Sequence, residues 1–145
     1  MSQRLARMHL QERTTLLDFD DIATVTLPVG MRGLVEDALR HDPPTPAELE
    51  QAIDLIEDAL ATLRLVKTDR GELVITDAFL RAMLGLHEQG PGLALGDVEV
   101  LFQRLAIRAH GAPVATAELP HGRNIAAALL ILRECMHHLG FDRVL

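Results

Sequence analysis

The chain is poor in the residues that build disulfides, metal–thiolate sites and base-stacking surfaces. Its 145 residues include one cysteine, four phenylalanines and neither tryptophan nor tyrosine. A single cysteine, Cys135, excludes an internal disulfide and a thiolate zinc site, and it suits a reducing compartment. Few aromatic side chains also argue against single-stranded nucleic-acid binding, which uses aromatic stacking platforms. The core must therefore be built from aliphatic side chains.

Long apolar runs are missing as well. No stretch approaches the roughly 18–20 residues that a membrane span requires. Charged residues interrupt the first 13 positions, unlike the start of a secretory signal. We therefore expect a cytoplasmic protein without a membrane partner.

The formal net charge of −7 is unevenly distributed. Residues 1 to 17 carry three arginines and one glutamate, whereas residues 18 to 69 carry twelve acids and only four bases. Residues 70 to 145 are nearly balanced, with seven bases and eight acids. An acidic middle repels DNA, RNA and polyphosphate. We expect no nucleic-acid partner.

Hydrophobic spacing predicts a helix-dominated α/β domain over residues 18 to 145, preceded by an arm or helix over residues 1 to 17. A β-branched run predicts a strand over residues 22 to 29. Residues 65 to 75 predict a short hairpin or one strand. Apolar stripes predict helices over residues 31 to 39, 46 to 64, 78 to 90, 98 to 110 and 124 to 139. Thr45, Pro46 and Glu48 form a capping box at the second of these helices.

Three carboxylates, Asp18, Asp20 and Asp21, precede the predicted strand. Such a cluster could hold Mg²⁺, which prefers oxygen ligands. We expect a solvated turn there instead.

The final predicted helix carries Glu134, His137 and His138 around Cys135. Di-iron bundles use two E-x-x-H pairs, and this chain has one, so we expect a surface Glu–His pair without metal. The thiol could be a nucleophile beside a base, but neighbouring helix residues face different directions, and we expect a buried, inert thiol. No nucleotide-binding or hydrolase motif accompanies these residues. No cofactor is expected.

Residues 65 to 78 resemble the wing of winged-helix regulators. This leaves a winged-helix-like α+β interaction domain as an alternative fold. The preceding helix, residues 46 to 64, would then be the recognition helix, but its many acidic residues oppose docking into DNA.

A second resemblance covers more of the chain, from about Thr14 to Leu145. It rests on an ordered set of motifs: L-P-V-G at 27–30, Arg32, Glu36, D-P-P-T-P-A-E-L at 42–49, L-G-D-V-E-V-L at 95–101, L-P-H-G-R at 119–123, A-L-L-I-L-R-E at 128–134 and L-G-F-D-R at 139–143. The set resembles the second lobe of the exopolyphosphatase and guanosine pentaphosphate phosphohydrolase (Ppx/GppA) family. The resemblance implies a single lobe of an actin-like (RNase H-like) phosphatase, in which phosphate is held between two lobes by glycine-rich loops and Mg²⁺.

The chain departs from this family where the chemistry would be. A segment matching the first lobe is absent. Where a D-I-G-G-G-S-T-E type loop should precede the L-P-x-G strand, Leu16 to Asp21 contain no glycine, and only Asp18 could match the loop's aspartate. Ile75 to Ala78 replace a later G-G-T loop. We therefore expect a non-catalytic pseudoenzyme that acts as a binding, assembly or regulatory module. The alternative is a Mg²⁺-dependent phosphohydrolase of polyphosphate or guanosine pentaphosphate, working through Asp18 or Asp20.

We also expect a homo-oligomer or a subunit of a protein complex, because two apolar helix stripes lack assigned partners. The predicted interface lies on the final helix. Its candidate residues are Ile125, Leu129, Leu132 and Met136.

Overall fold

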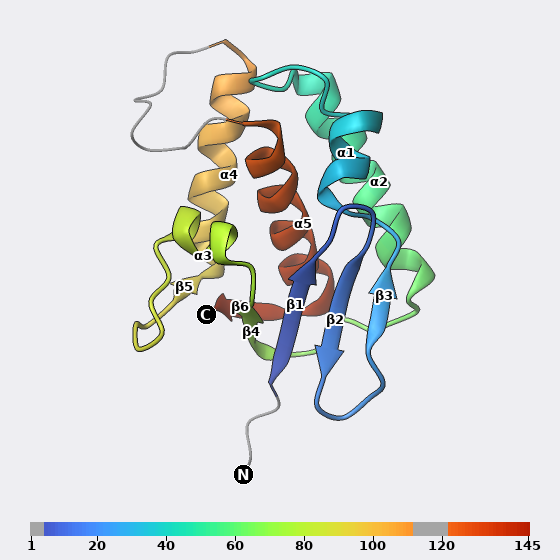
Figure 1. The fold of residues 1–145 in the computed structure, drawn as a ribbon, viewed down its shortest axis with the longest axis vertical. Coiled ribbons are helices and arrows are strands. Elements are labelled where there is room, and N and C mark those ends of the chain that lie inside the picture. The colour runs from blue at the N-terminus through green and yellow to red at the C-terminus, as the bar shows by residue number, and fades with distance from the viewer. Residues whose placement is uncertain (1–4, 112–121) are drawn as a thin grey trace.

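The computed structural model describes residues 5–111 and 122–145. Its strands form one six-stranded sheet with the order β3-β2-β1-β4-β6-β5 (Figure 1). The elements are β1 Ala6–Leu10, β2 Thr15–Phe19, β3 Val25–Leu27, α1 Met31–Asp37, α2 Pro46–Thr62, β4 Gly71–Ile75, α3 Ala78–Leu84, β5 Leu93–Ala94, α4 Leu95–Ala109, α5 Arg123–Leu139 and β6 Phe141–Val144. The predicted α/β class is confirmed. Among the described residues, no helix is long and apolar enough to cross a membrane.

The first two strands form an antiparallel hairpin within this sheet. The arm or helix that we expected over residues 1 to 17 is therefore, from residue 6 onward, part of the domain. Buried Ala6, Met8 and Leu10 alternate with half-buried Arg7 and His9, which is the two-residue period of a strand with one covered face. Because Arg7 and His9 are polar, the sequence of this strand also resembles a loose helical pattern.

β4 lies in the middle of the sheet, parallel to β1 on one side and to β6 on the other. Residues 65 to 75 thus contribute one strand and no hairpin. A wing would sit at an exposed edge, so the winged-helix alternative is wrong.

Local sequence signals place most helix ends correctly. Thr45 and Glu48 form the predicted capping box of α2, and Gly140 ends α5 in the left-handed conformation with φ 93°. α3 is shorter than expected and ends at Gly85, with φ 69°, rather than near residue 90. The two-residue strand β5 was not predicted.

α5 is the central helix of the core, and it packs against α1, α2 and α4 behind the sheet (Figure 1). Leu129, Leu132 and Met136 have no exposed surface within the single chain, and Ile125 is half-buried. These four residues were the interface candidates. The structure places three of them inside the core, because α5 is apolar on nearly all sides and neighbouring elements cover it.

Candidate functional site

The carboxyl ends of β1 and β4 meet at one edge of the sheet, because these strands are parallel neighbours. Open α/β sheets bind ligands at such an edge. The turn of residues 11 to 14 follows β1, and Thr76 and Asp77 follow β4. We expected Leu16 to Asp21 to replace the first phosphate loop, but residues 16 to 19 are inside β2. The turn that reaches this edge is the β1–β2 hairpin turn.

The residues that follow β4 are bonded to β1. The backbone N–H of Leu10 donates to Asp77 Oδ2 at 3.0 Å. Thr76 donates its backbone N–H to the Met8 carbonyl at 3.3 Å, and its hydroxyl donates to the same oxygen at 3.1 Å. The Asp77 carboxylate is therefore fixed at the end of β1, where it accepts a backbone donor.

The backbone N–H groups in the first turn of α1 also have partners within the protein. The backbone N–H of Met31 donates to the Gln11 carbonyl, and those of Arg32 and Gly33 donate to the Glu12 carbonyl at 2.8 and 3.1 Å. A helix N-terminus offers such N–H groups to anions when they are free. Here the hairpin turn takes them.

Gly30, the glycine of the L-P-V-G motif, permits this close approach. A Cβ atom at position 30 would lie 2.6 Å from backbone atoms of Gln11, Glu12 and Arg13. The missing side chain at Gly30 thus lets the backbone of the hairpin turn pack against the start of α1.

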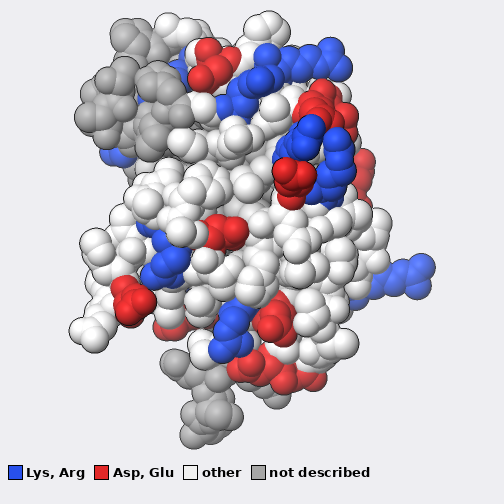
Figure 2. Space-filling view, in the orientation of Figure 1, with Lys and Arg blue, Asp and Glu red and all other residues white. Residues whose placement is uncertain are grey.

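Mixed charges cover the outside of this edge. Figure 2 shows basic and acidic groups clustered over α1 and the hairpin turn. Glu36 pairs with Arg13 at 2.7 Å and with Arg32 at 3.0 Å, and Arg32 also reaches Glu12 at 3.5 Å. Hydrogen bonds from Arg13 and then Arg32 lower the pKa of Glu36. Both arginines are committed to carboxylates at this edge.

Asp18, Asp20 and Asp21 lie on and after β2, away from the hairpin turn. Asp18 accepts a hydrogen bond from the Thr24 hydroxyl, and Asp20 accepts one from the Leu5 N–H and pairs with Arg7 at 3.5 Å. Within the described residues, the three aspartates form no group with the spacing of metal ligands.

A polar cluster lies where α2, α4 and α5 meet. We call it the α5 cluster, and it consists of Glu57, Glu99, Arg133, Glu134, His137 and His138. Arg133 Nε donates to Glu99 at 2.7 Å, and its Nη1 donates to Glu134 at 2.8 Å. The Arg133 guanidinium also lies 3.9 Å from the centre of the Phe102 ring. Arg133 thus links the helices through charge and ring contacts.

The pairing in this cluster differs from the E-x-x-H pattern. His137 hydrogen-bonds Glu99, whereas His138 Nε2 lies 3.0 Å from Glu57 Oε2 and 3.7 Å from Glu134 Oε1. Glu134 is buried rather than on the surface, and burial raises its pKa against the opposing charges of Arg133 and His138. The E-x-x-H pattern paired Glu134 with His137; the four-residue spacing of Glu134 and His138 is the signal in the sequence that could have identified this pair.

Cys135 is fully buried, as expected. Burial, and to a lesser extent the charge of Glu134, raises the pKa of the thiol to about 12. A buried thiol of this kind is inert as a nucleophile.

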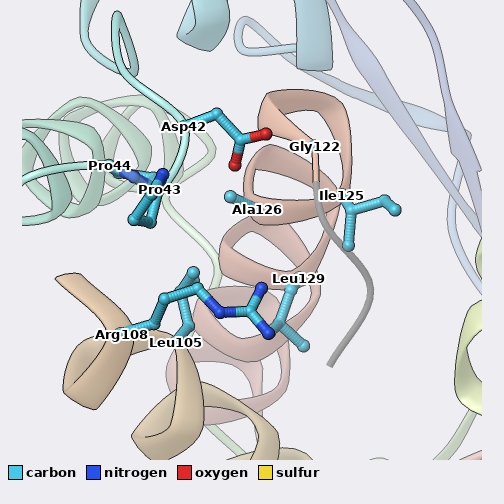
Figure 3. Close-up of a pocket in the computed structure, with 9 residues that line it drawn as sticks. All are labelled: Asp42, Pro43, Pro44, Leu105, Arg108, Gly122, Ile125, Ala126 and Leu129. Atoms are coloured by element: carbon cyan, nitrogen blue, oxygen red, sulfur yellow. The ribbon is translucent and has the colours of Figure 1, made fainter. Parts of the chain in front are cut away.

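An enclosed space between the 42–44 turn, α4 and the start of α5 is too small for a substrate (Figure 3). Its volume is about 10 Å³, enough for one water molecule. Arg108, Leu105 and Leu129 line it. It is a packing gap and not a ligand pocket.

No protein-family model and no curated protein matches the sequence. Solved structures do match. The Ppx/GppA enzyme of Aquifex aeolicus aligns with a TM-score of 0.69 at 17% identity, over 99% of this chain and 54% of that one. An exopolyphosphatase of Cytophaga hutchinsonii aligns with a TM-score of 0.64 at 13% identity, over 98% of this chain and 52% of that one. An exopolyphosphatase-like protein aligns with a TM-score of 0.62 at 15% identity, over 93% of this chain and 49% of that one.

This chain spans about half the length of these structures. The predicted resemblance is therefore confirmed at the level of fold: the chain has the actin-like α/β fold of one lobe of the Ppx/GppA phosphatases.

Proposed function

We propose that this domain is a non-catalytic, Ppx/GppA-like module for binding, assembly or regulation. The observation that carries the proposal is the hydrogen bond between the Leu10 N–H and Asp77. It joins the segment after β4 to the end of β1 at the carboxyl edge and leaves a carboxylate where a phosphate would need donors.

Phosphate binding requires free backbone N–H groups and little negative charge nearby. The donors of α1 at this edge are taken by the carbonyls of Gln11 and Glu12. At an effective dielectric constant of ~20, a carboxylate ~4 Å from a phosphate charge costs about 4 kcal/mol. A penalty of this size removes useful affinity for polyphosphate.

The test is phosphate release from polyphosphate, guanosine pentaphosphate and p-nitrophenyl phosphate in the presence of Mg²⁺. We expect no turnover above that of an Asp18→Ala, Asp20→Ala, Asp21→Ala triple variant. Turnover that the triple variant loses would establish the alternative, a Mg²⁺-dependent phosphohydrolase.

A module of this kind needs a partner, and we propose a second copy of the chain or another protein subunit. Leu129, Leu132 and Met136 of α5 are fully buried within one chain, so we place the contact elsewhere. Val100 and Ile107 are large apolar side chains exposed on α4, at 43% and 46%. Light scattering of the protein, with a Val100→Asp, Ile107→Asp variant beside it, measures both the oligomeric state and the use of this face.

A further inference from the structure

The α5 cluster contains three side chains whose ligand atoms converge. A carboxylate oxygen of Glu57, a carboxylate oxygen of Glu134 and a ring nitrogen of His138 all lie within 4.8 Å of one another. We propose that these three residues form a binding site for a divalent transition-metal ion of the zinc class. The site is independent of the proposed function, since it lies on α2 and α5 and uses none of the residues at the carboxyl edge.

The spacing of these atoms matches a tetrahedral ion. Zinc binds histidine nitrogen and carboxylate oxygen at about 2.0–2.2 Å, so neighbouring ligand atoms in a tetrahedral site stand about 3.4 Å apart. His138 Nε2 is 3.0 Å from Glu57 Oε2 and 3.7 Å from Glu134 Oε1. These two distances lie on either side of the required value, and the oxygens of Glu57 and Glu134 lie within 4.8 Å of each other, so side-chain shifts bring all three atoms to one ion.

The helices hold the three ligands in place. Glu134 and His138 are four residues apart on α5 and therefore share one face. Glu57 comes from the middle of α2, which packs against α5. Sites built on helices hold their geometry better than sites on loops.

Glu134 is positioned by a neighbour that is itself held. Its Oε2 accepts a hydrogen bond from Arg133 at 2.8 Å, which leaves Oε1 on the side of His138. Arg133 is fixed in turn by Glu99. Outer contacts of this kind orient metal-binding carboxylates, and a divalent ion would compensate the charge of a side chain that is only 3% exposed.

The donor set selects the metal. One imidazole and two carboxylates suit zinc and cobalt, whereas Mg²⁺ prefers oxygen ligands and retains its water. Three protein ligands leave one position open. This position faces an open surface hollow of about 480 Å³ that Lys67 and Arg133 also line. The two cations favour an anionic fourth ligand over a neutral one.

Calorimetric titration with Zn²⁺ tests the proposal. We expect one ion per chain and tetrahedral visible bands with Co²⁺. At a hundredfold excess of Zn²⁺ over its Kd, we expect the melting temperature to rise by about 8 °C. Mg²⁺ should produce no shift.

The variants Glu57→Gln and His138→Ala alter half-exposed side chains, so both should fold. Each should weaken Zn²⁺ binding by more than the roughly 10–100-fold that even an outer contact contributes. His87→Ala, a change to an exposed histidine outside the cluster, should bind like the parent protein. A Kd weaker than ~1 mM, or Zn²⁺ binding that survives His138→Ala unchanged, would overturn the site.

Discussion

Asp77 Oδ2 accepts the backbone N–H of Leu10 at 3.0 Å, across 67 residues of sequence. Asp77 occupies the N-cap position of α3, yet its side chain makes no capping hydrogen bond to that helix. The side chain of Asp77 thus bonds to β1 and does not cap α3. Its carboxylate instead closes the edge at which parallel strands usually present a ligand site.

We predict that Asp77→Ala lowers the free energy of unfolding by ~1–3 kcal/mol, because the Leu10 N–H then lacks its partner. Asp77→Asn keeps an acceptor oxygen and should recover most of this loss. Urea denaturation of the three proteins measures the difference. Equal losses in the two variants would mean that the charge of Asp77, and not its hydrogen bond, stabilises the edge.

Gly30 and Gly33 provide a matched pair of glycine substitutions. At position 30 a methyl group would meet the hairpin backbone, whereas at position 33 nothing lies within 4 Å. Gly30→Ala should therefore cost ~1–3 kcal/mol by overpacking. Gly33→Ala, in the interior of α1, should stabilise by ~0.5–1 kcal/mol. Thermal unfolding followed by circular dichroism decides, and a neutral Gly30→Ala would show that the hairpin turn is not held against α1.

The capping box of α2 makes stability depend on pH. Burial opposes ionisation of Glu48, but hydrogen bonds from the Thr45 backbone, His41 and the Arg40 backbone lower its pKa to about 2. A carboxyl with a lowered pKa in the folded state stabilises above its ordinary pKa of 4.5, and the contribution disappears as the pH falls toward 2.

We therefore predict that Glu48→Gln costs ~1 kcal/mol at neutral pH, the typical worth of a helix cap. The gap between the variant and the parent should close between about pH 5 and pH 2. Urea midpoints measured across this range provide the test. A difference in stability between the two proteins that stays constant with pH would show that the cap does not depend on the ionisation of Glu48.

Local signals explain what the sequence predicts well. The capping box at Thr45 and Glu48, the glycine after α5 and the apolar stripes act within a few residues, so they can be read from the chain alone. The ordered motifs from Leu27 onward likewise predict the lobe. Gly30 belongs to one of these motifs, but a glycine is needed there because of a close contact with Gln11 and Arg13, which sequence spacing does not reveal.

Contacts between distant segments account for what was missed. The sequence leaves open whether residues 65 to 75 form a hairpin or one strand, and only the neighbours β1 and β6 of β4 decide for one strand. In the sequence, His138 only neighbours an E-x-x-H pair. Its contact with Glu57 was missed because Glu57 lies 81 residues away on α2. The burial of Leu129, Leu132 and Met136 was not foreseen, because an isolated stripe shows its apolar positions and not the elements that cover them.

Cys135 should be unreactive in the folded protein. It is fully buried, and its pKa is raised to about 12, so almost no thiolate forms at neutral pH. Labelling with a thiol reagent should proceed only through unfolding, at a rate that increases with urea in step with the loss of structure. Rapid stoichiometric labelling without denaturant would place the thiol in an accessible environment.

Leu132 and Met136 distinguish a core helix from an interface helix. Both are fully buried within one chain. An aspartate at either position would put an unpaired charge into the core, and we predict a loss above ~4 kcal/mol, a large part of the ~5–15 kcal/mol that stabilises a domain. Ile107→Asp, at a position that is 46% exposed on α4, should change the free energy of unfolding by less than ~0.5 kcal/mol.

Circular dichroism and light scattering together separate the two roles of α5. If Leu132 belongs to the core, Leu132→Asp melts the fold, whatever the oligomeric state of the parent. If it belonged to an interface, the variant would keep its helical signal and its melting temperature while its mass fell to that of one chain. Ile107→Asp gives the opposite pattern when α4 carries a contact between copies: the fold persists and the mass decreases. Since α5 is surrounded by α1, α2 and α4 in a single chain, we expect unfolding for Leu132→Asp.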